Sequence, residues 1–299
     1  SAIWLGNYAV QHKNAAQIHA LSQEIARLLN SSFGVIGEAA NSVGGYLAGA
    51  VPFGPIEGRN AAQMLSTPMK AYILAGVEPD LDIADGVSAV KSLREAEMVA
   101  ALTVFKSQSL LDVADVLLPI APFTETAGTF VNCEGRAQSF HPVTKSAGES
   151  RAGWKVLRVI GSALELDGFD FGTIEDVRNK VLGDSLVVDS RRLGNSLAID
   201  KFALPEAVSG IQRIADIPIY FADPIVRRSG PLQATRDADA PNARMSGTLI
   251  SKLGLKPGDK VRIKSEAGEV TVVLIEDNAV AAGCLRLAGG HGDTMALGG

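Results

Sequence analysis

Short apolar runs alternate with helical hydrophobic periods over residues 1–185. Ile18, Leu21 and Ile25 recur at three- and four-residue spacing, which predicts an amphipathic helix over 14–29. Further strands are expected at 3–5, 33–36, 71–75, 98–105 and 115–118, and further helices at 61–65, 87–93, 107–113, 154–166 and 173–181. This alternation is typical of an α/β domain with a doubly wound, mostly parallel sheet. The runs 71–75 and 98–102 are apolar enough to predict central strands that are buried on both faces.

The pattern changes character after about residue 215. The proline-bearing runs 217–221 and 223–226 are interpreted as edge strands, because proline lacks the amide that a central strand needs. A short helix at 246–253 precedes period-two or β-branched runs at 260–264, 269–275 and 283–287. We therefore predict an α/β domain over 1–185, a linker over 186–214 and a small β-barrel over 215–299.

Charge and composition exclude several classes of function. The 299 residues carry 28 Lys and Arg against 33 Asp and Glu, so the formal charge of −5 argues against nucleic acid as a partner. Cys133 and Cys284 are too few for a four-thiolate iron–sulfur cluster or an all-cysteine zinc site. The four histidines show no ligand spacing. We therefore expect no metal site. Separately, no apolar segment of the sequence is long enough to predict insertion into a membrane.

Other catalytic or nucleotide-binding patterns are absent or weak. The glycines at 34, 37, 44 and 45 follow a predicted strand, yet their spacing does not match a dinucleotide-binding loop, and close passage of the chain beside the sheet explains them as well. This makes a free-standing nucleotide-binding module the least favoured hypothesis. Glu125 and Glu134 are a conceivable acid/base pair, with loop hydrogen bonding as the alternative.

The segment 114–136 is the most informative part of the chain. It reads ADVLLPIAPFTETAGTFVNCEGR, a strand followed by a polar loop at the carboxyl end of a sheet strand, where ligand sites of α/β proteins lie. It resembles the molybdopterin oxidoreductase signature of the form A-D-x-x-L-P, then E, then G-T-x-x-N-x-E-G-R. The runs 242–246 and 252–261 resemble the molybdopterin-dinucleotide-binding domain of that superfamily, which implies a double-psi barrel.

A finer resemblance rests on 5–7, 37–44 and 223–228, which are similar to the family of large iron–sulfur subunits of bacterial respiratory complex I, NADH–quinone oxidoreductase. The resemblance implies a scaffold that supports electron transfer from NADH to quinone without a catalytic residue or cofactor of its own. The iron–sulfur clusters are then expected in an N-terminal part of the parent polypeptide that precedes this fragment. That part and other peripheral-arm subunits are the implied partners, on the cytoplasmic side of the bacterial inner membrane, with no independent activity of the fragment.

The alternative is the C-terminal part of a catalytic molybdopterin oxidoreductase such as a formate dehydrogenase. The resemblance then places five residues near the pterin: Gly128, Thr129, Asn132, Glu134 and Arg136. Under either hypothesis a charged fraction of only 20% leads us to expect an exposed apolar surface on the isolated chain. The uncharged window 39–56, with Val51 and Phe53, is the candidate surface, and a loop buried inside the domain is the competing interpretation.

Overall fold

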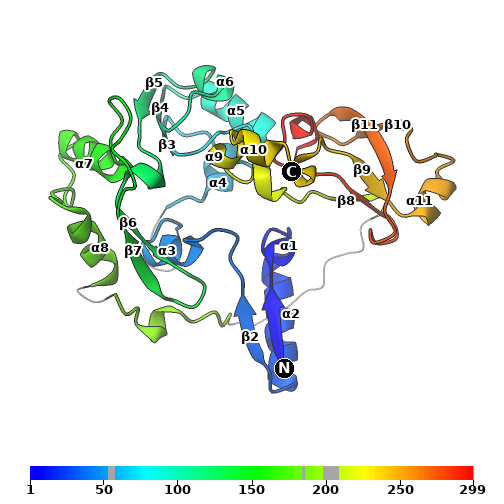
Figure 1. Cartoon of the computed structure of the whole chain (residues 1–299), viewed down its shortest axis with the longest axis horizontal. Coiled ribbons are helices and arrows are strands. Elements are labelled where there is room, and N and C mark those ends of the chain that lie inside the picture. Colours follow the sequence, from blue (N-terminus) through cyan, green and yellow to red (C-terminus); the bar gives the residue numbers. More distant parts are fainter. Residues whose placement is uncertain (53–57, 184–185, 198–208, 299) are drawn as a thin grey trace. The chain divides into compact units, whose positions relative to one another are not determined.

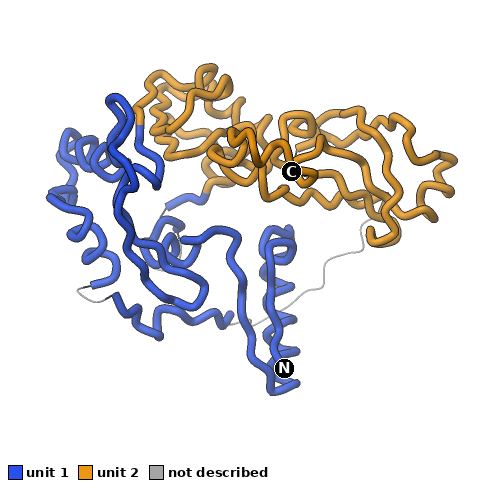
Figure 2. Tube along the Cα trace, in the orientation of Figure 1, with its two compact units in different colours: residues 1–60, 120–206 blue, residues 61–119, 207–299 orange. Residues whose placement is uncertain are grey.

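The computed structural model describes residues 1–52, 58–183, 186–197 and 209–298. The chain forms two compact units, each built from two stretches of sequence (Figures 1 and 2). Unit 1 comprises 1–60 and 120–206, and unit 2 comprises 61–119 and 207–299. The predicted domains are continuous in sequence, and their boundaries at 185 and 215 stay a prediction. The predicted linker over 186–214 lies partly outside the described residues.

Unit 1 contains a two-stranded parallel sheet and a separate two-stranded antiparallel hairpin. Its elements are β1 (Ala2–Leu5), α1 (Asn7–Val10), α2 (Ala15–Leu28), β2 (Ser32–Val35), α3 (Ser42–Leu47), β6 (Gly128–Val131), β7 (Ala137–Phe140), α7 (Gly153–Ala163) and α8 (Ile174–Leu182), with 3-10 turns at Phe123–Glu125 and Ser190–Arg192. The predicted helix over 14–29 is confirmed. It ends where Asn30 adopts a positive φ of 47°, a conformation that asparagine tolerates better than most residues.

Unit 2 contains a three-stranded parallel sheet and a five-stranded mixed sheet. Its first stretch forms α4 (Ala61–Ser66), β3 (Ala71–Ala75), α5 (Gly86–Arg94), β4 (Met98–Thr103), α6 (Gln108–Leu111) and β5 (Val116–Pro119). Its second forms β8 (Gln212–Ile214), α9 (Pro224–Arg227), α10 (Gly230–Gln233), β9 (Ala243–Met245), α11 (Gly247–Lys252), β10 (Lys260–Lys264), β11 (Glu269–Glu276) and β12 (Cys284–Arg286), with 3-10 turns at Ile219–Phe221, Arg236–Ala238 and Met295–Leu297.

The sequence pattern predicts one doubly wound sheet, but among the described residues the parallel strands belong to two separate sheets. β1 and β2 pair in unit 1, whereas β3, β4 and β5 pair in that order in unit 2. β4 is central and buried as predicted, since Val99 and Leu102 are buried and Val99 shares a core cluster with Leu93 of α5. The prediction that 71–75 is a central strand is wrong, because β3 lies at the sheet edge and Ile73 is 52% exposed. The apolar run 71–75 therefore predicts a strand correctly, but it does not predict that both faces of the strand are buried.

The C-terminal strands form a curled mixed sheet over one apolar core (Figure 1). β10 and β11 pair as an antiparallel hairpin, β9 runs parallel to β11, and β12 pairs with β9 and β8. Leu274 and Leu287 are fully buried in the core beneath it. Among the described residues the pairing runs from β10 at one edge to β8 at the other. Closure into a double-psi barrel therefore stays a prediction.

The two proline-bearing runs are not strands, and that prediction is wrong. The run 217–221 forms a 3-10 turn, and 223–226 enters α9. The Asp223 Oδ1 accepts hydrogen bonds from the backbone N–H groups of Ile225 and Val226 at 2.8 and 3.0 Å. Pro224 occupies the first helical turn, where its missing N–H is not needed. Asp-Pro is thus a helix start at this position.

The uncharged window 39–56 contains α3, in which no residue is fully buried. Val51 is exposed, and Phe53 lies outside the described residues. Whether this window binds another protein stays a prediction. No helix in the described ranges has both the length and the apolar character needed to cross a membrane.

Candidate functional site

The segment that carries the strongest sequence motif folds as a hairpin rather than as a long polar loop. β6 and β7 pair antiparallel, with Thr129 opposite Ser139 and Val131 opposite Ala137. Of the five predicted residues, Gly128 and Thr129 lie on β6, Asn132 and Glu134 lie in the turn, and Arg136 directly precedes β7. The structure therefore gathers all five on one hairpin.

The turn of this hairpin is built by Asn132 and Gly135. The Asn132 Oδ1 accepts hydrogen bonds from the backbone N–H groups of Glu134 and Arg136 at 3.0 and 2.9 Å. Gly135 has a φ of +80°, and an added Cβ would meet the Leu193 side chain at 2.1 Å. The Arg136 and Glu134 side chains form an exposed ion pair at 3.9 Å. These polar groups therefore contact one another and the turn itself.

The strand residues of the hairpin divide between packing and a cavity. An added Cβ at Gly128 would meet the Phe140 ring at 2.6 Å, and that ring packs edge-on against Phe130. The Thr129 and Ser139 hydroxyl oxygens lie 2.9 Å apart across the two strands. Thr129 also lines a cavity of unit 1, and it is the one predicted residue of the five among the described lining residues.

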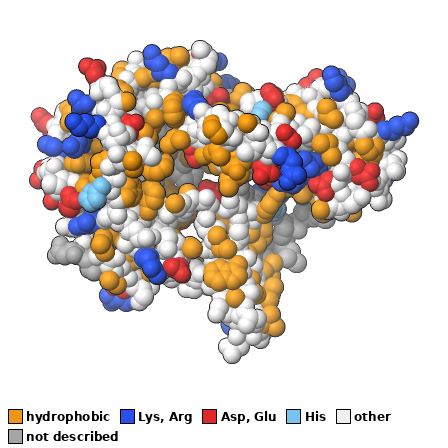
Figure 3. All heavy atoms as spheres, in the orientation of Figure 1, with side chains coloured by type: hydrophobic (Ala, Val, Ile, Leu, Met, Phe, Trp, Pro, Cys, Tyr) orange, Lys and Arg blue, Asp and Glu red, His pale blue; other side chains and the backbone are white. Residues whose placement is uncertain are grey.

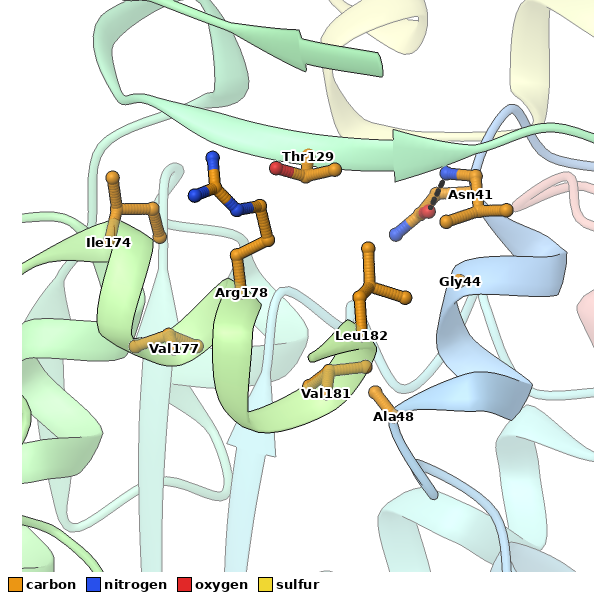
Figure 4. A pocket seen from close by; sticks show the side chains of 10 residues that line it. Asn41, Gly44, Ala48, Thr129, Ile174, Val177, Arg178, Val181 and Leu182 are labelled. Carbon is orange, nitrogen blue, oxygen red and sulfur yellow. Dashed lines mark hydrogen bonds between the residues drawn. The ribbon is translucent and has the colours of Figure 1, made fainter. Parts of the chain in front are cut away.

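This unit 1 cavity has a volume of about 160 Å³ and lies between β6, α3 and α8 (Figure 4). Its described lining consists of Asn41, Gly44, Ala48, Thr129, Val131, Ile174, Val177, Arg178, Val181 and Leu182. Most of these side chains are apolar. Arg178 supplies the positive charge, and its Nε and Nη2 donate to the neighbouring Asn179 Oδ1 at 3.2 and 3.1 Å.

Hydrogen bonds at both ends of α8 hold this helix in place beside the cavity. Thr173 and Asp176 form a capping box, in which the Thr173 Oγ1 accepts from the Asp176 N–H and the Asp176 carboxylate accepts from the Thr173 N–H. Hydrogen bonds from Thr173, followed by the backbone bond from Gly172, hold the pKa of Asp176 below its ordinary value. At the other end, Arg192 donates to the carbonyl oxygens of Val181 and Leu47 at 2.9 and 3.1 Å. One guanidinium thus ties the last turns of α8 and α3 together.

Asn41 is a site residue that sequence reasoning misses. Its Oδ1 accepts a hydrogen bond from the buried Val131 N–H at 2.8 Å, which joins the start of α3 to β6 across 90 residues of sequence. The side chain lies so close to Gly44 that a Cβ there would overlap it at 1.9 Å. Gly44 therefore leaves room for the Asn41 side chain, and the passage of this glycine run beside the sheet stays a prediction. A single asparagine gives no periodic signal, so the contact is visible only in the fold.

Unit 2 holds a second polar group of residues that the sequence does not reveal. Glu78, on the loop after β3, is 2% exposed and accepts hydrogen bonds from Arg227 Nη2 at 2.8 Å and Arg228 Nη2 at 2.5 Å. Arg227 also pairs with Asp82 at 2.8 Å, and Arg228 lies over the Phe105 ring at 4.5 Å. We call Glu78, Asp82, Arg227 and Arg228 the Glu78 cluster. It occupies the carboxyl end of the parallel strands, where ligands of α/β proteins commonly bind.

The described part of the chain contains no cluster of side chains that could bind a metal ion. No set of three or more His, Cys, Asp or Glu side chains there is placed to hold a metal ion. Cys133 and Cys284 are both free thiols. Glu125 accepts a hydrogen bond from the Ala147 N–H at 2.9 Å, which is the loop role weighed against acid/base chemistry. The expected absence of cofactors in this chain stays a prediction.

Comparison with known proteins places these features in a family. The molybdopterin oxidoreductase model matches residues 1–163. The G subunit of NADH-quinone oxidoreductase from Mycobacterium bovis is 26% identical over 221 residues, which cover 72% of this chain and 27% of that protein. The alpha subunit of F420-dependent formate dehydrogenase 2 from Methanococcus maripaludis is 24% identical over 243 residues, covering 68% of this chain and 35% of that protein. The chain thus spans about a third or less of the length of these relatives.

A solved structure shares the fold. Acetylene hydratase from Pelobacter acetylenicus superposes with a TM-score of 0.54 at 17% identity, covering 76% of this chain and 38% of that one. At this identity the likeness concerns the fold alone. The family model, however, spans more than half of the 299 residues. The chain therefore belongs to the molybdopterin oxidoreductase family.

Proposed function

We propose that this chain is part of an NADH–quinone oxidoreductase, within its large iron–sulfur subunit, where it acts as a scaffold for electron transfer from NADH to quinone. The observation that carries the proposal is the similarity to a G subunit of NADH-quinone oxidoreductase over 72% of the chain. Its partners would be the cluster-bearing part of the same subunit and other peripheral-arm subunits, on the cytoplasmic side of the bacterial inner membrane. The C-terminal sheet would close as the double-psi barrel of this superfamily.

The residues of unit 1 support a role without a pterin. Asn132, Glu134 and Arg136 satisfy one another and the turn, so their polar atoms are not gathered around a cavity. The cavity beside Thr129 has a volume of about 160 Å³, below the roughly 300–1,000 Å³ of ordinary cofactor pockets. The cavity beside Thr129 is therefore smaller than a pterin-sized ligand requires, which supports the proposed scaffold role. A chain that supports its neighbours by packing requires no such site.

The second candidate is part of a catalytic molybdopterin oxidoreductase of the formate dehydrogenase type. Similarity to a formate dehydrogenase alpha subunit over 68% of the chain favours it. Under this hypothesis Gly128, Thr129, Asn132, Glu134 and Arg136 would lie near a pterin, and the intact protein would hold molybdenum. The two hypotheses therefore differ in metal content and in electron donor.

Purification of the natively expressed protein separates them. An antibody raised against this chain should co-isolate other complex I subunits, together with NADH–quinone reductase activity and without stoichiometric molybdenum. Stoichiometric molybdenum with formate-dependent dye reduction would instead support the second candidate. A control precipitation with an antibody blocked by the purified chain identifies activity that is carried over nonspecifically.

A further inference from the structure

We propose that the unit 1 cavity binds a small aliphatic monocarboxylate. The cavity has two chemically distinct sides (Figure 4). Val177, Val181 and Leu182 of α8, with Ala48 after α3, form an apolar side. Arg178, Thr129 and Asn41 bring polar groups to the same space. This pairing of a short apolar surface with a few polar groups is the arrangement that orients an amphiphilic ligand.

The polar side of the cavity favours an anion. None of the ten described lining residues is acidic, whereas Arg178 is positively charged. Among the described residues, its hydrogen bonds from Nε and Nη2 go to the neutral amide oxygen of Asn179 rather than to a carboxylate. A guanidinium beside apolar surface attracts a carboxylate more strongly than it would in water.

The hydrogen-bonding capacity of the polar side points to an acceptor ligand. The Asn41 Oδ1 accepts from the Val131 N–H, and the Asn41 amide nitrogen adds a donor to this side of the cavity. The Arg178 guanidinium has donors only, and the Thr129 hydroxyl, which shares a hydrogen bond with the Ser139 hydroxyl, can donate to a ligand when Ser139 donates to it. A carboxylate, which only accepts, matches these donors. An ammonium group has donors only and does not match them, whereas an alcohol can accept a hydrogen bond but carries no charge to pair with Arg178.

The size of the cavity limits the rest of the ligand. About 160 Å³ is roughly half the lower bound for ordinary cofactor pockets, so a nucleotide or pterin is too large. A short alkyl chain, in contrast, would cover Val181, Leu182 and Ala48. Butyrate is therefore a suitable probe, with a carboxylate for Arg178 and a tail for the apolar side.

Titration of the purified 299-residue chain with matched probes tests the proposal. Butyrate should perturb the backbone amide NMR signals of Thr129 and Val131 with a Kd of roughly 1 mM, which is a reasonable affinity for so few heavy atoms. Butan-1-ol should bind at least tenfold more weakly, and butylammonium should not bind. Equal binding of the alcohol, perturbations confined to other regions, or no butyrate binding at tens of millimolar would each overturn the proposal.

Variants assign the site. Arg178→Gln should weaken butyrate binding at least tenfold, and Arg178→Lys should restore part of the loss because it keeps the charge. Lys180→Gln removes an exposed charge from the same helix outside the described lining and should leave the Kd unchanged. Ala48→Leu fills the apolar side while retaining Arg178, so it should also weaken binding. Unchanged affinity in folded Arg178→Gln overturns the proposal. If that variant fails to fold, unchanged affinity in Ala48→Leu does so.

Discussion

Two groups of residues, the Glu78 cluster of unit 2 and the unit 1 cavity, use arginine in opposite ways. Charged side chains are scattered over the face of the molecule shown in Figure 3. In the cluster, two carboxylates face two guanidiniums, and Glu78 and Arg227 are almost completely buried. In the cavity, Arg178 stands beside apolar side chains, and its hydrogen bonds go to a neutral amide oxygen. Paired charges hold two segments of the fold together, whereas a guanidinium without a carboxylate partner among the described residues can bind an anionic ligand. The buried ion pairs of the Glu78 cluster are therefore assigned a structural role, and Arg178 is the candidate for ligand binding.

The largest expected effect follows from breaking the Glu78 cluster. Glu78→Gln keeps the side-chain shape but removes the buried carboxylate that pairs with both Arg227 and Arg228 and leaves Asp82 to pair with Arg227, so the free energy of unfolding should fall by about 3 kcal/mol. Urea denaturation followed by circular dichroism measures this change. Glu97→Gln removes one member of the exposed Lys70–Glu97 pair and should have no resolvable effect. Equal stability of the two variants would contradict the structural role of the cluster.

A smaller effect is expected at the edge of the unit 1 cavity. Asn41→Ala leaves the buried Val131 N–H without its acceptor, so the free energy of unfolding should fall by about 2 kcal/mol in urea denaturation. Asn14→Ala is the matched control, because Asn14 also precedes a helix but its side chain makes no capping hydrogen bond there. A loss in Asn14→Ala as large as that in Asn41→Ala would show that helix starts, not the bond to β6, determine the result.

Mild acid should affect unit 2 through His291. Its ring packs against Phe221 with centroids 4.7 Å apart, and burial lowers its pKa from the ordinary 6.5, against a smaller opposing effect of Asp293. The unfolded state then takes up the proton first, so stability should decrease as the pH falls below about 6.5 and level off below the folded pKa. Comparing urea midpoints from pH 8 to pH 5 tests this. His291→Asn should flatten this part of the profile, and an unchanged slope would exclude His291 as its source.

The smallest effect concerns Asp176 in unit 1. Because capping hydrogen bonds lower the pKa of its carboxyl, the contribution of Asp176 is present above the ordinary value of 3.8 and is lost as the pH falls through the folded pKa. Amide hydrogen exchange of α8 should therefore accelerate in this acidic range, after correction for intrinsic rates. Glu175→Gln changes the adjacent acid outside the capping box and should preserve the response, whereas Asp176→Asn should reduce it.

A structural feature of this chain is predictable from the sequence when the residues that cause it are close together in the sequence. The helix over 173–181 is predictable because Thr173 and Asp176, three residues apart, build its start. The position of strand 71–75 at the edge of its sheet is not predictable from the sequence, since an apolar run does not reveal which strands pair with it. The strand prediction over 223–226 fails because the capping capacity of Asp223 decides the conformation more strongly than β-branched neighbours do.

The candidate sites follow the same rule. The motif places Gly128, Thr129, Asn132, Glu134 and Arg136 within nine residues of sequence, and their common hairpin is a local structure. Asn41 and Glu78, in contrast, meet partners 90 and 149 residues away, and neither lies in a pattern that announces it. Single polar residues with distant partners therefore require the fold. The roles of Asn41 and Glu78 can be assigned only once the structure shows which residues they contact.

The discontinuity of unit 2 has a consequence for synthesis on the ribosome. Glu78 emerges 149 residues before Arg227, an interval of roughly 7–30 s at ordinary translation rates. During that time β3, β4 and β5 form without the helix that neutralises the buried carboxylate. The Glu78 carboxylate of the nascent segment 61–119 therefore stays solvated at first, and unit 2 reaches its final structure only once the last third of the chain has been translated.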